Sequence, residues 1–459
     1  MAAPAAVASF SQRAIRLFLS VLLISHGFVL PTPGFSGGGL IYSNDSAGTI
    51  FTWNSSAPVP YRVDGGSLGS LGSATATSLV NSMFQVWTDV PTANLTFTNA
   101  GALLGVGDGD VSTPAEFNAV DCPSSGPGFG QNPVIFDADG SLFAALGFPS
   151  GVIGFAGPGL IDPASRRITC ALAALNGRFL DGISVPGNPE LSLDAFSAAF
   201  IHEFGHFSGL DHSEINTICF VNPGPCANND QAFGLPTMYP ILLTTTTEGD
   251  PPVPAQKSLA VDDMAWFSRL YPETSNNPPA QVPFTSVYGT ITGNVFFSDG
   301  VTPVQGANVI AQNNTLPTRN TVSVVSGYLF TGNLGQIVTG TNRGSSFGSR
   351  DVTNVGRFDL PVPAGTYTIL LSSIRSTFTG GSSVGPLNPP IPLPGVGVLS
   401  VPTVTVAAGN LVNIPGGIVL RSTPSRLDAF ESAGSPLPDP SPFWLRRDQG
   451  LKAMEEETA

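Results

Sequence analysis

The stretch HEFGHFSGLDH, residues 202–212, places the strongest constraint on the fold of this chain. Residues four apart lie one above the other on a helix, so His202 and His206 can offer two imidazole nitrogens to one metal ion. Glu203 then lies beside the metal without being a ligand. The spacing therefore predicts a helix with a metal site on one face.

A third ligand cannot come from the next helical turn without crowding, so the chain must leave the helix and bend back. Gly209 can adopt the positive φ that this exit needs, and His212 follows it. Three histidines leave one tetrahedral position open for water, which is the catalytic pattern for zinc. Zinc lowers the pKa of such a water towards ~7, so that Glu203 can accept its proton. We expect one Zn²⁺, held by His202, His206 and His212.

The use of histidine supports this interpretation. The chain has 4 histidines, of which one is His26 near the N-terminus and the others all belong to the motif. A lone HExxH also occurs by chance among ordinary helix residues, but Gly209 and His212 extend the match to the whole HExxHxxGxxH pattern. The pattern favours a metal site over the chance alternative.

Apolar periodicity divides the chain into two parts. Before residue 272 three segments have helical spacing, and after residue 285 the apolar residues alternate as in strands. The helical stripes are Val80, Met83, Phe84 and Trp87; Phe196, Phe200, Phe204 and Phe207; and Ala260, Met264, Phe267 and Tyr271. The alternating faces are Val287, Ile291, Val295 and Phe297, and Tyr367, Ile369 and Leu371.

These patterns predict a signal peptide over 1–36, a catalytic domain over 37–274, a linker over 275–284, a β-sandwich over 285–421 and a disordered tail over 422–459. The 53 glycines and 42 prolines fit a chain rich in strands and loops. The second half has neither His nor Cys, so we expect no chemistry there. Anchoring, substrate capture and stabilisation remain open as its role, and we expect peptide hydrolysis to survive its deletion.

The N-terminus predicts export. Arg13 and Arg16 precede an apolar run that is shorter than the ~20 residues of a membrane span, and a small-x-small cleavage site follows at residues 34–36. An uncleaved anchor is the alternative. We expect a secreted or cell-surface protein with no transmembrane segment in the mature chain. The net charge of −14 and the lack of basic clusters disfavour nucleic acid as a partner.

An oxidising compartment favours disulfides among the 4 cysteines. Three pairings are open. The turn-rich stretch between Cys219 and Cys226 could close on itself, which would leave Cys122 to pair with Cys170.

The extended motif resembles the metzincin metallopeptidases, and Ser213 directly after the third histidine resembles their matrixin branch. Thr237-Met238-Tyr239-Pro240 is similar to the Met-turn of that branch. The resemblance implies that Met238 supports the metal site from below and that Tyr239 and Pro240 border the substrate pocket. Residues 258–263 are similar to the start of the matrixin C-terminal helix.

The stretch 151–156 is similar to the substrate-binding edge strand of the same branch, which makes Gly154, Phe155 and Ala156 further substrate-pocket candidates. A protein or peptide substrate would pair with this strand. Phe155 stands where that branch has a histidine of its structural zinc site, so we predict no second zinc. The matrixin-like sequence begins almost at the predicted cleavage site, so we expect no propeptide with a cysteine switch.

Segments such as GRFDLPVPAGTY, residues 356–367, resemble the carboxypeptidase regulatory-like domain, which has a transthyretin-like sandwich. The resemblances together imply an α+β metzincin-like domain, with a mixed twisted sheet and three helices, followed by an all-β sandwich.

The function they imply is a secreted, monomeric zinc endopeptidase that hydrolyses peptide bonds by attack of a zinc-bound water, with Glu203 as general base. The alternative is a catalytically silent secreted adhesion or extracellular-matrix-binding protein on a protease-like scaffold.

Asp137 and Asp139 precede a glycine at the alternating positions used by calcium loops, but the downstream glutamate of a full EF-hand loop is missing. Ca²⁺ binding at these two residues is one interpretation, and a plain Asx turn is the one that the sequence favours.

Overall fold

The computed structural model describes residues 38–43, 47–184, 190–215, 235–243, 255–317, 319–330, 348–374, 403–420 and 445–447. The predicted signal peptide, the proposed Cys219–Cys226 pair and most of the predicted tail lie outside these residues. None of the described helices is both long enough and apolar enough to cross a bilayer.

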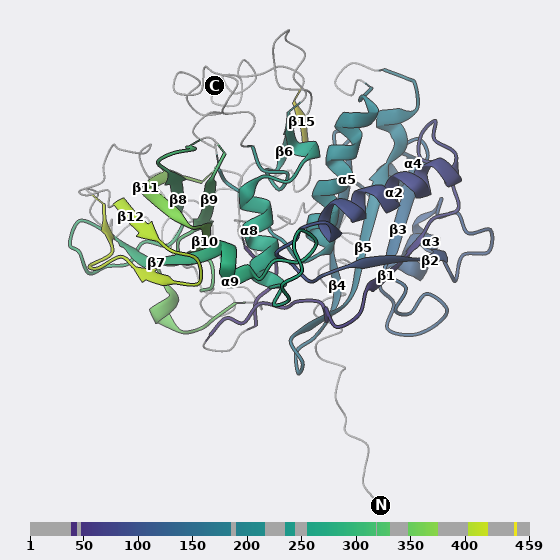
Figure 1. The fold of residues 1–459 in the computed structure, drawn as a ribbon. Coiled ribbons are helices and arrows are strands. Elements are labelled where there is room, and N and C mark those ends of the chain that lie inside the picture. The colour runs from purple at the N-terminus through teal and green to yellow at the C-terminus, as the bar shows by residue number, and fades with distance from the viewer. Residues whose placement is uncertain are drawn as a thin grey trace, which may run out of the picture.

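The fold is mixed α+β, with several sheets and few helices (Figure 1). The elements of the first half are β1 (Val59–Val63), α2 (Ser73–Thr88), β2 (Phe97–Ala102), α3 (Pro114–Val120), β3 (Pro133–Asp137), α4 (Ser141–Ala145), β4 (Gly154–Asp162), β5 (Arg167–Asn176), η1 (Gly177–Leu180), α5 (Leu193–Phe207), β6 (Ile241–Leu243), η3 (Ala255–Lys257) and α8 (Val261–Leu270). The second half contains α9 (Phe284–Val287), β7 (Tyr288–Phe296), β8 (Ala307–Asn313), β9 (Thr321–Val325), η4 (Val352–Asn354), β10 (Arg357–Pro363), β11 (Gly365–Ser373), β12 (Thr403–Val406), β13 (Leu411–Asn413) and β14 (Ile418–Val419).

The first half is built on a five-stranded sheet in the order β2-β1-β3-β5-β4. Its strands pair in parallel except β4, which runs antiparallel to β5 and forms one edge. Successive side chains of β5 point to opposite faces, so Ala171 and Ala173 join the core beneath α2 and α5, whereas Leu172 and Ala174 join a second core. The predicted edge strand, residues 151–156, thus leads into β4 at an edge of the sheet.

Helices α2 and α5 form where the sequence predicts them. The predicted stripe of α2 is buried, and the side chain of Ser192 caps α5 by accepting a hydrogen bond from the Ala195 amide. The rings of Phe84 and Phe204 stack with centroids 3.7 Å apart, which fixes α5 against α2.

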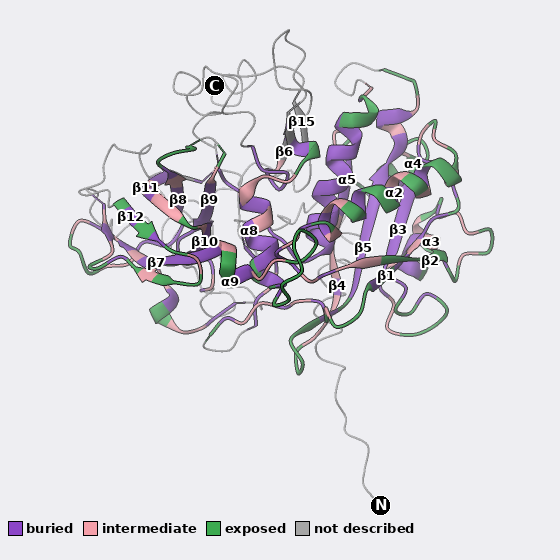
Figure 2. Ribbon diagram, in the orientation of Figure 1, coloured by how far each residue is buried: buried purple, intermediate pink, exposed green. Residues whose placement is uncertain are grey.

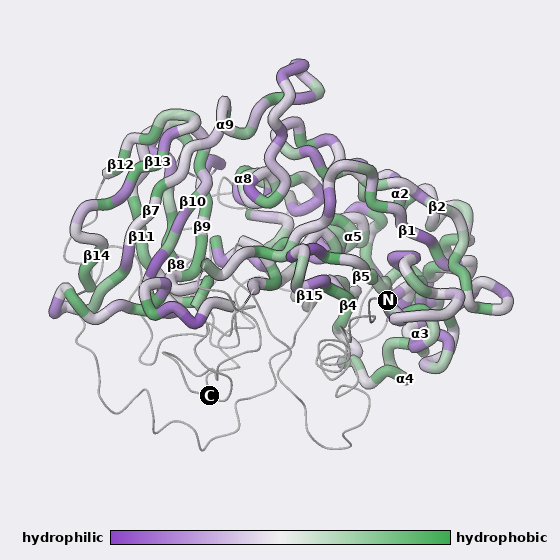
Figure 3. The backbone as a smooth tube through the Cα atoms, turned by 90° about the horizontal axis from the view of Figure 1, so that it is seen from below, coloured by the Kyte–Doolittle hydropathy of each residue, from purple (hydrophilic) through white to green (hydrophobic). Residues whose placement is uncertain are grey.

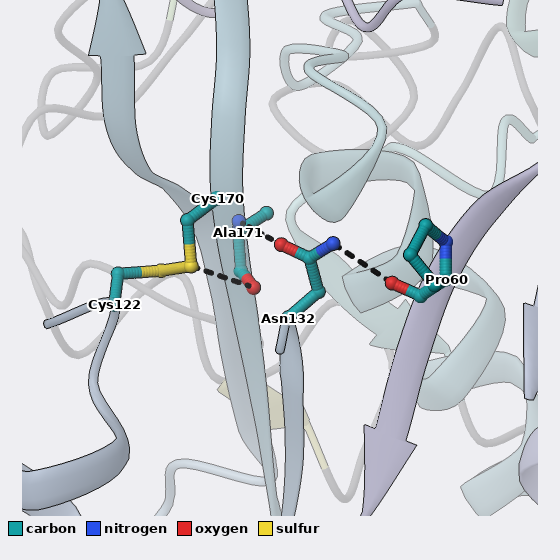
Figure 4. The surroundings of a disulfide bond; sticks show 5 residues. All are labelled: Pro60, Cys122, Asn132, Cys170 and Ala171. Carbon is teal, nitrogen blue, oxygen red and sulfur yellow. Dashed lines mark hydrogen bonds between the residues drawn. A yellow bond between two sulfur atoms is a disulfide. The ribbon is translucent and has the colours of Figure 1, made fainter. Parts of the chain in front are cut away.

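A disulfide bond and the side chain of Asn132 link segments of this sheet (Figure 4). Cys122, after α3, forms a disulfide with Cys170 on β5, which confirms this part of the predicted pairing. The Asn132 side chain donates to the carbonyl oxygen of Pro60 on β1 and accepts from the amide of Ala171 on β5, at 2.8 and 3.2 Å. Asn132 therefore ties two strands that the sheet itself does not pair.

The second half contains two four-stranded sheets. One has the order β10-β7-β13, with β14 also on β7, and the other has the order β12-β11-β8-β9. Ile291 and Val295 on β7 and Tyr367, Ile369 and Leu371 on β11 are buried, as the alternation predicts. The strand-rich second half is therefore confirmed.

The predicted linker and tail contain ordered contacts. Within 275–284, the Val282 amide donates to the Pro91 carbonyl and the Phe284 amide to the Glu273 carbonyl, both across to the first half. Within the predicted tail, β15 (Leu445–Arg447) pairs in parallel with β6.

Helix α8 lies between the two halves in both views of the chain (Figures 1 and 3). Most of α8 is buried (Figure 2). The sequence predicts one apolar stripe on this helix, but Asp262, Asp263 and Trp266 are buried as well. The predicted stripe was incomplete because α8 packs on the first half of the chain with one face and on the sandwich with another. One hydrophobic core therefore runs through both halves.

Candidate metal centre

Helix α5 carries His202, Glu203 and His206 and ends directly after them. It lies against β4 and β5 (Figure 1). Gly209 has a φ of 87° and donates its amide to the carbonyl of His206, while the Leu210 amide donates to the carbonyl of Gly205. This exit turns the chain back, as predicted, and brings His212 over the helix.

The Nε2 atoms of the three histidines converge. They lie 3.0 Å apart for His206 and His202, 3.0 Å for His206 and His212, and 3.2 Å for His202 and His212. A tetrahedral zinc ion with Zn–N distances of ~2.05 Å needs nitrogens ~3.3 Å apart, so a shift of a few tenths of an ångström admits the ion. This buried group could hold a metal ion.

The opposite ring nitrogens are anchored by backbone carbonyl groups. Nδ1 of His202 lies 2.7 Å from the Thr237 oxygen, and Nδ1 of His206 lies 2.9 Å from the Leu210 oxygen. A carbonyl oxygen can only accept, so each Nδ1 carries the proton and each Nε2 presents its lone pair. Burial lowers the pKa of His202 well below its usual value and that of His206 to about 4. Neutral imidazoles are the form that binds a metal.

A pH dependence of stability follows from His206. Its pKa falls from 6.5 in an unfolded chain to about 4 in the fold. The unfolded chain gains a proton as the pH falls through the higher value, whereas the folded chain stays neutral until the lower one. The free energy of unfolding should therefore decrease by ~3 kcal/mol on account of His206 as the pH falls from 6.5 to about 4.

We expect the urea midpoint of zinc-stripped protein to fall over this pH window. His206→Asn removes the ionisable group and should flatten the profile by the corresponding amount. Parallel profiles for the two proteins would contradict the assignment.

Glu203 is fully buried beside the histidines. Neither of its carboxylate oxygens has a hydrogen-bond partner within the described part of the chain. A methyl group added at Gly154 on β4 would lie 3.0 Å from Cγ and 3.3 Å from Oε1 of Glu203, so the edge strand passes directly over this side chain. Burial raises the pKa of Glu203 well above its usual value. A buried carboxyl group without a partner is costly, and such groups mark functional sites.

Met238 packs against α5 at Gly205, between two of the histidines in the sequence. A Cβ added at Gly205, between His202 and His206 on α5, would lie 2.2 Å from Sδ of Met238. The methionine therefore fills the space that the glycine leaves, and any larger residue at 205 would displace it.

Asp263 holds this turn in place, a role that the sequence did not assign. Its carboxylate accepts hydrogen bonds from the amides of Thr237 and Met238, at 2.8 and 3.0 Å, and from the amide of Ala260 at 2.8 Å. Because the carbonyl of Thr237 anchors His202, Asp263 acts on the metal site through one peptide unit. The only sequence feature that could have indicated this role is that Asp263 lies in the stretch 258–263, which is similar to the start of the matrixin C-terminal helix.

The substrate-pocket candidates fall into two groups. Tyr239 and Pro240 lie directly before β6, with Tyr239 fully buried and Pro240 half-buried. Gly154, Phe155 and Ala156 begin β4, and Gly154 contacts Glu203.

The side chain of Phe155 lies in the second core on the other face of the sheet, 4.6 Å from the ring of Phe148 and 5.4 Å from that of Phe143. Only its backbone can therefore face a ligand near Glu203. Successive side chains of a strand point to opposite faces, so Phe155 cannot share the face on which Gly154 contacts Glu203. The family resemblance gave residues 154–156 as one group and did not separate the two faces.

The two acidic candidates for calcium form an Asx turn. Oδ1 of Asp137 accepts from the amides of Asp139 and Gly140, and Oδ2 accepts from the amide of Phe143. Asp139 accepts from the amide of Ser141 in the same way. The turn that the sequence favoured is present, and it starts α4.

Comparison with protein families and with curated proteins found no match to this chain.

Proposed function

We propose that this chain is a zinc-dependent endopeptidase of the metzincin type, with His202, His206 and His212 as metal ligands and Glu203 as general base. One observation carries the proposal: three buried imidazoles converge on one point, and the buried Glu203 carboxylate beside them has no hydrogen-bond partner among the described residues. A structural zinc site would have a fourth protein ligand, and the described residues place only three around this point.

Zinc held there would activate a water molecule and polarise a substrate carbonyl. The residues of the chain supply the rest. Glu203 accepts the proton of the water and passes it to the leaving amine, and Gly154 leaves room for its side chain under the edge strand.

The edge strand β4 supports a peptide as substrate. It pairs only with β5 among the described strands, so one row of its backbone groups faces away from the sheet. An extended peptide can add to such an edge and lay its scissile bond beside Glu203.

Removal of zinc tests the proposal. A strong chelator should abolish cleavage of a denatured protein substrate by the purified protein, and added Zn²⁺ should restore it. The products, identified by mass spectrometry, should come from internal peptide bonds. Full activity after the metal has been shown to be gone would exclude the zinc mechanism. Folded, zinc-loaded protein that cleaves nothing would favour the scaffold alternative.

A further inference from the structure

The chain that follows the third ligand is held from two sides. On one side the Ser213 amide donates to the carbonyl of Met238, 2.8 Å away. On the other side the side-chain amide of Asn308, on strand β8 of the sandwich, donates to the carbonyl of Glu214 at 2.9 Å. Ser213, Glu214 and Asn308 are all almost completely buried. The backbone after His212 is therefore fixed partly by the second half of the chain.

The donor group of Asn308 is the part of this side chain that makes hydrogen bonds. Its Nδ2 also donates to the hydroxyl of Ser372 on β11 at 3.0 Å, whereas its own Oδ1 is buried without a partner in the described residues. An unpaired buried acceptor is destabilising by ~1–3 kcal/mol. An apolar residue would avoid that cost, so the hydrogen bond to Glu214 is the feature that an asparagine supplies here.

Two adjacent carboxylates on α8 connect the halves at a second point. Asp263 holds the turn at Thr237 and Met238. Asp262 points to the sandwich instead, where Oδ1 accepts from the Ser323 amide on β9 at 2.8 Å. The side chain of Ser213 hydrogen-bonds to the same carboxyl group. Neighbouring residues of one helix thus bind the metal site and the sandwich.

Strand β9 has an open edge that makes this contact. It lies at the edge of its sheet and pairs only with β8 among the described strands. The outward amide of Ser323 bonds to Asp262, and its carbonyl accepts from Nε1 of Trp266 at 2.9 Å. Side chains of α8 therefore cover the open edge of the sandwich, which would otherwise expose unpaired backbone groups.

We propose that the β-sandwich is a positioning element of the metal centre, which holds the backbone after His212 through the Asn308–Glu214 and Ser323–Asp262–Ser213 contacts. The inference rests on the metal binding in the proposed function, but not on peptide hydrolysis. Partners outside the ligand shell commonly change metal affinity by 10–100-fold. Asn308 acts through two residues of backbone, so we place its effect at the lower end, ~10-fold.

The test is the rate at which zinc leaves the full-length protein, measured by transfer to a chromophoric chelator. Asn308→Ala should release Zn²⁺ ~10-fold faster than the wild type. The matched control is Asn313→Ala, since Asn313 is also a buried asparagine of β8, and its side chain bonds to the nearby amides of Thr315 and Leu316 and to Tyr367 within the sandwich. This control should lose some thermal stability without faster release.

Two outcomes overturn the inference. One is equal release from Asn308→Ala and Asn313→Ala, which would mean that only general stability matters. The other is release from Asn308→Ala at the wild-type rate. Both leave the proposed function intact, whereas a wild-type protein that binds no zinc overturns the two together.

A measurement on the wild type covers the case in which Asn308→Ala does not fold. Coupling between two sites is reciprocal, so zinc must in turn stabilise the sandwich contacts. Hydrogen exchange of the Ser323 amide should be ~10-fold slower in zinc-loaded than in zinc-stripped protein, while amides in β13 should not change. Equal exchange of the Ser323 amide in the two forms would overturn the inference.

Discussion

Replacement of Glu203 by glutamine is expected to lower the rate of peptide hydrolysis by ~10²–10⁴-fold while zinc remains bound. Glutamine keeps the size of the side chain but cannot accept a proton. The proposed ligand atoms are the three Nε2 atoms, and Glu203 makes no hydrogen bond to them, so the substitution leaves the ligand set unchanged. The turnover number should fall, and zinc content should stay at one ion per chain.

Two further variants test whether the effect is specific to Glu203. Glu273→Gln changes another buried glutamate, one that accepts hydrogen bonds from the amides of Thr274 and Ser275 far along the chain, and should leave the rate unchanged. His206→Ala should lose metal and rate together. If zinc-loaded Glu203→Gln cleaves at the wild-type rate, Glu203 is not the general base.

A chain that ends at Asn276 is expected not to form a stable native fold. This replaces the expectation, drawn from the sequence, that the first half hydrolyses peptides alone. Deletion of the sandwich would expose Trp266 on α8, which is 2 % exposed in the whole chain, and would leave Asp262 buried on one side without its Ser323 donor. It would also remove Tyr328, whose ring packs edge-on against Tyr42 at 5.7 Å.

Thermal unfolding followed by circular dichroism measures this effect. The truncated chain should lack the cooperative transition of the full chain and should bind zinc weakly. A chain that ends at Leu420 is the control, because it keeps every sandwich strand and loses only β15 among the described elements. Cooperative unfolding of the shorter chain near the wild-type temperature would show that the two halves are independent.

The sequence by itself determined the local structure around the metal site. The four-residue spacing of His202 and His206 is a property of any α-helix, and the positive φ of Gly209 is one that other residues adopt only with strain. The apolar stripe of α2 and the alternation of β7 and β11 likewise depend only on the helical and strand periods. Such features need no knowledge of distant residues.

The tertiary structure alone decided how the two halves meet. Asp262, Asp263 and Trp266 are polar or amphipathic residues on a helix, and their sequence pattern is that of a solvated face. Asp262 and Trp266 are buried because a second sheet covers them and supplies partners from residues more than fifty positions away. Asp263 is buried against the turn at Thr237 and Met238 in the first half. Likewise, nothing in the spacing of Asn308 or Ser323 reveals that they contact Glu214 and Ser213, the residues that follow the third histidine. Periodicity reports the faces of one element, whereas the partner of each face depends on the packing of the whole chain.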